Sequence, residues 1–290
     1  MMEPVIRALR DTETLGQVTA ARVEWLRFEA GGPRVLWEQY QECKDERYVR
    51  LHLDHVPVID ESDLQVDYLP ILAEALELGF DSVMVDGSRL PLEGNIEATR
   101  RVVELARTEK RGRSLFSGAV KKGSVPFSPA VEGELGAVLG HEEGPLPPYE
   151  ELFASGRGFT DVDEARRFVQ ETGVDWLSVA CGNIHGAVSG VARHEKKVEA
   201  RLDVKHLARL AEAAGVPLVL HGGSGIKREY IQEGIRAGIA KINVGTNIRQ
   251  PYEQGLRDSV AVAQQAVYQT VVQLVTEELQ VAGSARLLTP

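Results

Sequence analysis

The stretch Pro217-Leu-Val-Leu-His-Gly-Gly-Ser-Gly225 decides the fold. It begins as a short apolar run, which is typical of a buried strand, and changes at once into a histidine and a glycine-rich loop. A helical pattern over Lys227–Ala237 follows, and a second apolar run occupies Ala240–Val244. This order of strand, polar loop, helix and strand predicts a βαβ unit in a parallel sheet.

The same alternation extends toward the N-terminus. We predict further strands at Tyr48–Leu53, Ser82–Val85, Ala130–Glu134 and Trp176–Ala180. We predict helices at Leu69–Leu78, Ile96–Thr108, Asp161–Thr172 and Val204–Ala214. Two weaker strand candidates, Leu15–Ala21 and Pro33–Trp37, would complete a set of eight. Since a (β/α)8 barrel typically needs about 250 residues, we expect an α/β TIM barrel with an abbreviated N-terminal βα region, in a single domain over residues 1–290.

Turn residues mark the expected helix ends. Glycines stand where four of the helices should stop: Gly79, Gly173, Gly215 and Gly238. Thr160-Asp161, followed by Glu164, is typical of a capped helix start. Two polar stretches, 111–128 and 137–158, are expected to be long loops, which often form lids or bind ligands.

Composition limits the classes of partner. A formal net charge of −10 argues against non-specific binding to nucleic-acid phosphates, although backbone N–H groups could still bind a small anion. The two cysteines, Cys43 and Cys181, are too few for a disulfide framework. Because no leader pattern is visible and no apolar stretch approaches about 20 residues, we expect a cytoplasmic protein without a membrane or nucleic-acid partner.

Polar residues gather where the predicted strands end. Four of the seven histidines lie there, namely His52, His55, His185 and His221. In a parallel barrel these carboxyl ends meet at one rim, where active sites form. His55, His185 and His221 could present three nitrogen ligands to zinc and leave a fourth position open. His52 is interpreted as support for that site or as packing.

Three carboxylates lie near this predicted metal. Asp54 could exchange a proton with a metal-bound oxygen, or could only orient a histidine. Glu134 is a candidate to lie beside the metal. Glu142, with its neighbour Glu143, follows on the loop after that strand and could swing inward or remain solvated.

The last two predicted strands lead into glycine-rich loops. In barrels this is the usual phosphate site, built from backbone N–H groups and a helix N-terminus. Gly222 and Gly245 would let the backbone approach an anion closely, and Ser224 and Thr246 would add hydroxyl donors. The sequence therefore predicts a phosphate site next to the predicted metal.

Six motifs carry a family resemblance. They are Leu51-His-Leu-Asp-His55, Ser82-Val-Met-Val-Asp-Gly-Ser88, Val131-Glu-Gly-Glu-Leu-Gly136, Gly182-Asn-Ile-His-Gly186, Leu220-His-Gly-Gly-Ser-Gly225 and Lys241-Ile-Asn-Val-Gly-Thr246. In this order, over about residues 48–250, they resemble the class II (metal-dependent) fructose- and tagatose-bisphosphate aldolase family.

The resemblance implies a ketose-bisphosphate lyase of carbohydrate metabolism, such as glycolysis. It would cleave a phosphorylated ketose reversibly through a metal-stabilised enediolate of dihydroxyacetone phosphate. One catalytic zinc ion is implied, with room for a second metal or a monovalent cation, in a dimer or tetramer.

The resemblance also implies roles for single residues. The implied metal ligands are His55, His185 and His221, with Glu134 close by. Asp54 would exchange a proton with the aldehyde-derived oxygen, Glu142 would be the base, and Asn243 would contact the enediolate. The implied phosphate-binding residues are Gly186, Gly222, Ser224, Gly245 and Thr246.

Three departures from the family leave alternatives open. Residues 1–47 match poorly, Gly186-Ala-Val-Ser-Gly lacks the usual Tyr-Lys, and residues 251–290 lack the usual C-terminal pattern. The substrate could therefore be smaller than a bisphosphate. A barrel lyase or epimerase with the same enediolate chemistry, and a sugar-phosphate-binding homologue without catalysis, are the alternatives.

Overall fold

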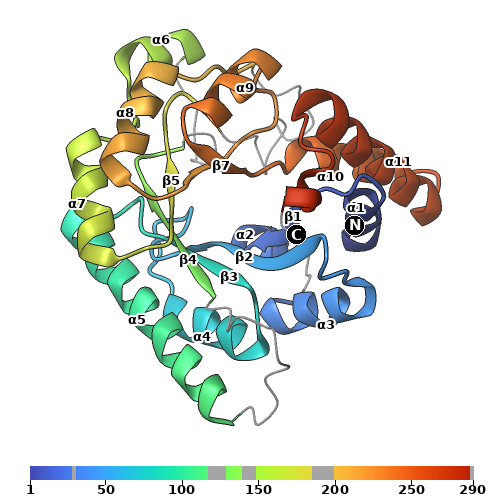
Figure 1. Cartoon of the computed structure of the whole chain (residues 1–290), viewed down its shortest axis with the longest axis horizontal. Coiled ribbons are helices and arrows are strands. Elements are labelled where there is room, and N and C mark those ends of the chain that lie inside the picture. The colour runs from blue at the N-terminus through green and yellow to red at the C-terminus, as the bar shows by residue number, and fades with distance from the viewer. Residues whose placement is uncertain (28–30, 117–128, 139–147, 185–198, 288–290) are drawn as a thin grey trace.

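A computed structural model describes residues 1–27, 31–116, 129–138, 148–184 and 199–287. Seven strands lie within these ranges and form one parallel sheet. Their order across the sheet is the same as their order in the sequence. They are β1 (Gly16–Ala21), β2 (Val49–Pro57), β3 (Ser82–Asp86), β4 (Ala130–Leu135), β5 (Trp176–Val179), β6 (Leu218–Leu220) and β7 (Ile239–Ile242). The sheet curls, and helices surround its outer face (Figure 1). The fold is thus TIM-barrel-like, with seven strands in the described ranges.

Helices precede β1, lie between successive strands and follow β7. They are α1 (Met2–Asp11), α2 (Arg22–Arg27), α3 (Pro33–Cys43), α4 (Tyr68–Leu78), α5 (Leu92–Phe116), α6 (Tyr149–Ser155), α7 (Val162–Thr172), α8 (Val204–Ala214), α9 (Arg228–Arg236), α10 (Thr246–Gly255) and α11 (Val260–Gln273). A π-helical turn, Leu274–Glu278, and a 3-10 turn, Ser284–Leu287, follow α11. None of the helices described is both long and apolar enough to cross a lipid bilayer.

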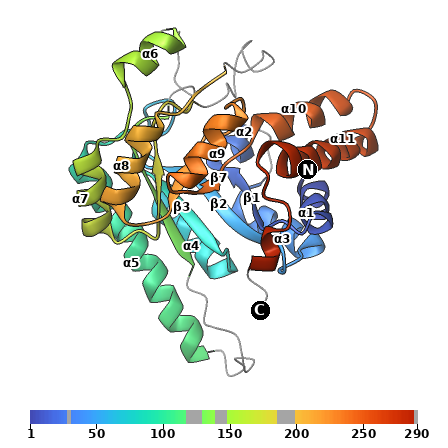
Figure 2. The same cartoon turned by 45° about the horizontal axis from the view of Figure 1, so that its top comes forward.

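The two ends of the described chain pack together. Helix α1 lies against α11, and the N- and C-terminal regions occupy the same side of the molecule (Figures 1 and 2). The backbone N–H of Gly283 donates to the carbonyl of Thr12 at 2.9 Å. Leu15 N–H donates to Ser284 Oγ at 3.0 Å. These bonds tie the last turn to the segment that enters β1.

Most of the predicted elements are confirmed, and one strand prediction is wrong. The weaker candidate over Leu15–Ala21 is β1, but Pro33–Trp37 lies in helix α3. Proline fits the first turn of a helix because its missing N–H would have no intrahelical partner there. Leu36 and Tyr40, four residues apart, are both buried on one face of α3. This segment therefore buries its apolar residues as a helix.

Parts of the two stretches predicted to be loops are helical. Helix α5 continues to Phe116, inside the stretch 111–128, and the stretch 137–158 contains α6. Three of the four predicted helix ends are confirmed. Gly79, Gly173 and Gly215 hold the left-handed conformation that glycine tolerates. Before Gly238, the cap is Ala237 in a right-handed conformation.

The cap of α7 is confirmed. The side chain of Asp161 accepts hydrogen bonds from the N–H groups of Asp163, at 2.9 Å, and Glu164, at 3.0 Å. These are two of the N–H groups that the first turn of a helix leaves without a partner. The cap thus starts α7 where the sequence predicts it.

The two faces of the curled sheet differ in chemistry. On β4, a side chain at Gly133 would meet Phe168 of α7, so this position faces the helices. Its neighbours Glu132 and Glu134 point the other way, since side chains alternate along a strand, and both are buried. Interiors of such barrels are usually filled by Val, Ile and Leu. Here the inner face carries charged groups.

Candidate metal and substrate site

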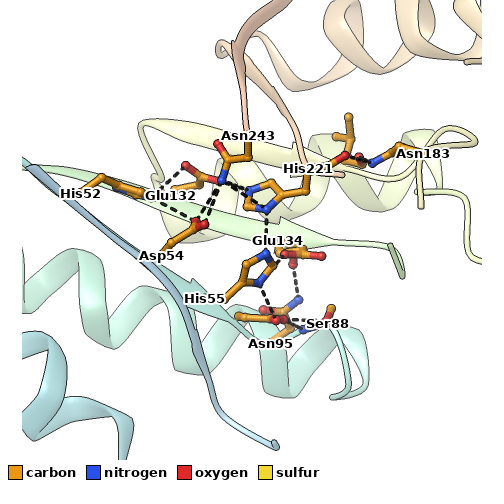
Figure 3. A network of polar contacts seen from close by, with 12 residues as sticks. His52, Asp54, His55, Ser88, Asn95, Glu132, Glu134, Asn183, His221 and Asn243 are labelled. Atoms are coloured by element: carbon orange, nitrogen blue, oxygen red, sulfur yellow. Dashed lines mark hydrogen bonds and ion pairs between the residues drawn. The ribbon is translucent and has the colours of Figure 1, made fainter. Parts of the chain in front are cut away.

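Side chains on the inner face of the sheet, from five strands or the residues that directly follow them, form one polar cluster. In Figure 3 the labelled side chains from β2 and β4 and those of His221 and Asn243, which directly follow β6 and β7, point toward one another. The cluster comprises Asp54, His55, Asp86, Glu132, Glu134, His221 and Asn243, and each of these residues hydrogen bonds or pairs with another member. The predicted residues Asp54, His55, Glu134, His221 and Asn243 are therefore brought together.

An irregularity in β2 directs two consecutive residues into the cluster. On a regular strand, Asp54 and His55 would point to opposite faces. The pairing of β2 with β3 shifts between Leu53 and Val56, as in a β-bulge, which can redirect a side chain. His55 has a φ of 35°, in the left-handed region that a non-glycine residue seldom adopts. The backbone strain accompanies its turn toward the site.

Two imidazole rings meet at nearly a right angle, 81°, at the centre of the cluster. His55 Nε2 lies 2.7 Å from His221 Nδ1. The other ring nitrogens contact carboxylates: His55 Nδ1 lies 3.1 Å from Asp86 Oδ2, and His221 Nε2 lies 2.8 Å from Glu132 Oε1. A carboxylate can only accept, so it places an N–H at each of these outer nitrogens. This is the arrangement that orients metal-ligating histidines in proteins.

The inner pair of nitrogens requires a positive charge between them. With the outer nitrogens protonated, neutral rings would direct two lone pairs at each other across 2.7 Å. A proton or a metal cation removes that repulsion. Burial lowers the pKa of His55, but the charge of Glu134 and the hydrogen bond to Asp86 outweigh it and raise the pKa to about 10. Burial and the charge of His55 lower the pKa of His221. The donor set therefore fits a cation.

Asp54 is held ionised beside the imidazoles. Asn243 Nδ2 donates to its two oxygens at 3.1 and 3.0 Å. Burial alone would raise the pKa of Asp54, but the charges of His221, His55 and Lys241 keep that pKa well below its ordinary value. Asp54, His55 and His221 form one group whose ligand atoms lie within 4.8 Å of one another. A carboxylate in this position can accept a proton from a bound substrate.

Glu134 offers a second place for a cation. Its Oε2 is buried and accepts no hydrogen bond from any residue that the structure describes, and it lies 3.5 Å from His55 Nδ1. Burial and the charge of Asp86 raise the pKa of Glu134 well above its ordinary value, whereas the positive charge of His55 lowers it, so the ionised carboxylate depends on a nearby positive charge. His55, Asp86 and Glu134 form another candidate metal-binding group.

The predicted phosphate-binding residues lie on two adjacent loops. Gly223 N–H donates to the carbonyl of Asn243 at 2.9 Å and joins the loops after β6 and β7. Asn247 N–H donates to Ser224 Oγ at 3.3 Å. Gly245 is the N-cap of α10 and Thr246 is its first residue. A helix N-terminus with nearby glycines suits an anion.

Four predicted or considered residues lie outside the described ranges: Glu142, Glu143, His185 and Gly186. Asn183, two positions before His185, is described. Its Nδ2 donates to the carbonyl of His221 at 3.1 Å, so the end of β5 is bonded to the end of β6.

Three residues with clear contacts were given no role from the sequence: Asp86, Glu132 and Lys241. Each lies within a quoted motif, and Glu132 and Lys241 stand two residues before the predicted Glu134 and Asn243. The two-residue period of a strand puts such neighbours on the same face. That spacing could have identified both of them.

The family described as class II fructose-bisphosphate aldolase matches residues 3–113 and 120–286 of this chain. A 6-phospho-5-dehydro-2-deoxy-D-gluconate aldolase of Halalkalibacterium halodurans is 35% identical over 209 residues, which cover 72% of this chain and 57% of that protein. A fructose-bisphosphate aldolase of Staphylococcus epidermidis is 36% identical over 198 residues, 68% of this chain and 54% of that protein. The chain thus spans less than three-fifths of the length of these relatives.

Solved structures share the fold. A putative fructose-1,6-biphosphate aldolase from Coccidioides immitis has a TM-score of 0.70 at 24% identity, covering 99% of this chain and 91% of that one. The YdjI aldolase from Escherichia coli K12 has a TM-score of 0.67 at 24% identity, covering 98% and 88%. At this identity the likeness concerns the fold.

Proposed function

Because this chain belongs to the class II fructose-bisphosphate aldolase family, we propose that it is a metal-dependent aldolase that cleaves a phosphorylated ketose reversibly. The observation that carries the proposal is the pair of imidazole nitrogens 2.7 Å apart, with the ionised carboxylate of Asp54 beside them. That arrangement combines a cation site with a proton acceptor.

His55, His185 and His221 are the proposed ligands of one catalytic zinc ion, with Glu134 near it. Zinc suits imidazole nitrogens and accepts a tetrahedral site with one open position. When bound, the ion would withdraw electrons from the carbonyl of the ketose and acidify the neighbouring C–H group. Glu134 Oε2 is buried and accepts no hydrogen bond within the described part of the chain, which supports a second metal ion or a monovalent cation beside it.

The proton transfers are assigned to two carboxylates. Asp54 would take the hydroxyl proton of the ketose as the C–C bond breaks and return it in the reverse direction. Asn243 donates to both oxygens of Asp54 and would keep the carboxylate oriented for this transfer. Glu142 would remove the proton from the C–H group next to the carbonyl in the condensation direction. In the cleavage direction it would return that proton to the same carbon.

The phosphate of the substrate is assigned to the two loops after β6 and β7. The proposed contacts are Gly186, Gly222, Ser224, Gly245 and Thr246. The hydrogen bond from Gly223 to Asn243 keeps these loops adjacent, and the N-terminus of α10 adds a favourable dipole for an anion. A phosphate bound there would lie next to His221, which begins the first of these loops.

The wider organisation is also part of the proposal. The seven-stranded sheet would be the greater part of an eight-stranded barrel in a single domain. We propose a cytoplasmic homodimer or homotetramer without nucleic-acid or membrane partners. Light scattering of the purified protein tests the oligomeric state.

Exchange of a proton of dihydroxyacetone phosphate with solvent deuterium tests the function. The zinc-loaded protein should show this exchange by NMR, a chelator should abolish it, and added zinc should restore it. The experiment does not require the aldehyde partner. A folded, zinc-bound protein that catalyses no exchange would contradict the proposal.

Asp54→Asn separates the two proton transfers. Because Asp54 is assigned to the hydroxyl proton, this variant should keep the exchange on dihydroxyacetone phosphate and lose cleavage and condensation. Asp63→Asn is the matched control, since the side chain of Asp63 is 88% exposed and pairs with Arg89. Equal loss of both reactions in Asp54→Asn would contradict the assigned role.

A further inference from the structure

A lysine ammonium lies among the buried acceptors beneath the site. Lys241, on β7, has a side chain that is only 16% exposed. Its Nζ lies 2.5 Å from Glu132 Oε2 and 3.2 Å from His52 Nε2. His52, Asp54 and Glu132 form a buried group with the donor atoms of a metal site. The ammonium therefore contacts two of the three members of a group that could otherwise hold a metal ion.

Glu132 connects this lysine to His221. Its carboxylate is fully buried and uses one oxygen for each partner: Oε1 accepts from His221 Nε2 at 2.8 Å, and Oε2 accepts from Lys241 Nζ at 2.5 Å. A buried carboxylate needs a paired charge and hydrogen bonds to remain in place. Without the ammonium, Glu132 would keep its contact with His221, but its buried negative charge would lose its paired positive charge and would be much less stable.

The orientation of His221 depends on that contact. Glu132 receives the N–H at Nε2, so Nδ1 is the nitrogen directed at His55. A turn of the ring, or a change in which nitrogen carries the hydrogen, would remove that nitrogen from the cation position. Second-sphere partners of this kind set both ring orientation and metal affinity.

His52 restrains the lysine from the other side. Its Nδ1 lies 2.8 Å from Ser82 Oγ, and Gln17 Nε2 donates to the same hydroxyl at 3.3 Å. Through these contacts β1, β2 and β3 restrain the ring whose Nε2 faces Lys241. The ammonium is thus held between two strands, β2 and β4, by acceptors that are themselves bonded.

We propose that Lys241 is a positioning residue: its ammonium is a fixed internal cation that holds Glu132, and Glu132 holds the His221 ring with Nδ1 toward the metal. The inference rests on the proposed function for the identity of the metal. It assigns no contact between Lys241 and substrate.

Zinc affinity of Lys241→Met, measured by competition with a chromophoric chelator, tests the inference. Methionine keeps much of the length of the side chain and removes the charge, and we expect a loss of about 10- to 100-fold in zinc affinity, the usual effect of removing a second-sphere partner. Lys205→Met is the matched control, because Lys205 lies exposed on α8, and it should bind zinc as the unmodified protein does.

A double-mutant cycle with Glu132→Gln distinguishes positioning from general destabilisation. If Lys241 acts through Glu132, Lys241→Met should cause no further loss of zinc affinity when Glu132 is already Gln. Independent losses that add in the double variant, or a Lys241→Met protein with unchanged affinity, would overturn the inference. If Lys241→Met does not fold, Lys241→Gln, which also removes the charge, takes its place in the cycle. An unmodified protein that binds no zinc would instead contradict the proposed function.

Discussion

The inner and outer faces of the same curled sheet are equally buried and chemically opposite. On β2, Leu51 and Leu53 are 2% and 0% exposed, while His52 between them is also 0% exposed. The leucines belong to the main hydrophobic core. His52 instead contacts the inner polar network of Ser82 and Lys241.

This contrast teaches that burial alone does not separate structural from functional residues. The outer face is stabilised by removal of apolar surface from water, at about 25 cal/mol per Å². A buried polar group on the inner face needs a polar partner or a bound cation, and a half-satisfied network would be destabilising. Removing a residue from the outer face should therefore change stability, and removing one from the inner face should change metal binding and activity.

The largest effect is expected for His221→Ala on the inner face. Loss of a proposed ligand should lower cleavage activity by about 10²- to 10³-fold, the scale of losing a group that stabilises charge in a transition state. Activity and zinc affinity are the measurements. His206→Ala on α8 is the control, because His206 contacts the carbonyl of Thr160 away from the cluster. A His221→Ala enzyme with unchanged activity would contradict the claim that inner-face residues serve metal binding and activity.

Phe168→Ala tests the outer face. Phe168 is fully buried against β4, and truncation of such a ring should reduce the free energy of unfolding by about 3–5 kcal/mol. Denaturant unfolding measures this loss. Zinc affinity of the folded variant should stay within twofold of the original protein, and a loss comparable with that of a ligand variant would contradict the comparison.

Gly133→Ala sharpens the same contact from the strand side. Its new methyl group would lie 2.9 Å from Phe168 Cε1 and 3.2 Å from Val174 Cγ1. Overpacking of this kind typically costs about 1–3 kcal/mol. Adding Phe168→Leu should recover part of the loss. If the two changes are simply additive in unfolding experiments, the steric explanation fails.

The smallest effect is expected at the N-terminus of α7, one of the helices that cover the outer face of the sheet. Asp161→Ala removes the cap of α7 and should lower the free energy of unfolding by about 1 kcal/mol. Asp161→Asn should retain most of the stability because asparagine caps equally well. Activity should be unchanged in both variants, and thermal unfolding beside an activity assay checks the pair.

Much of the fold could be predicted from local pattern. Apolar runs gave the positions of β1 and of the other six strands to within a few residues, and the ends of α4, α7 and α8 follow their glycines. The failure at Pro33–Trp37 has a local cause. A short run with Val, Leu and Trp is compatible with a strand or a helix, and the packing of Leu36 and Tyr40 decides for the helix.

The candidate site divides in the same way. The residue types at the strand ends follow from the linear sequence, which is sufficient to place Asp54, His221 and Asn243 at one rim, since parallel strands share the direction of their carboxyl ends. Only the tertiary structure decides that β2 is irregular after Leu53, so that His55 and Asp54 both face inward. It also decides that Lys241 pairs with Glu132, 109 positions away. Such contacts depend on the curl of the sheet and its register, and no local pattern contains that information.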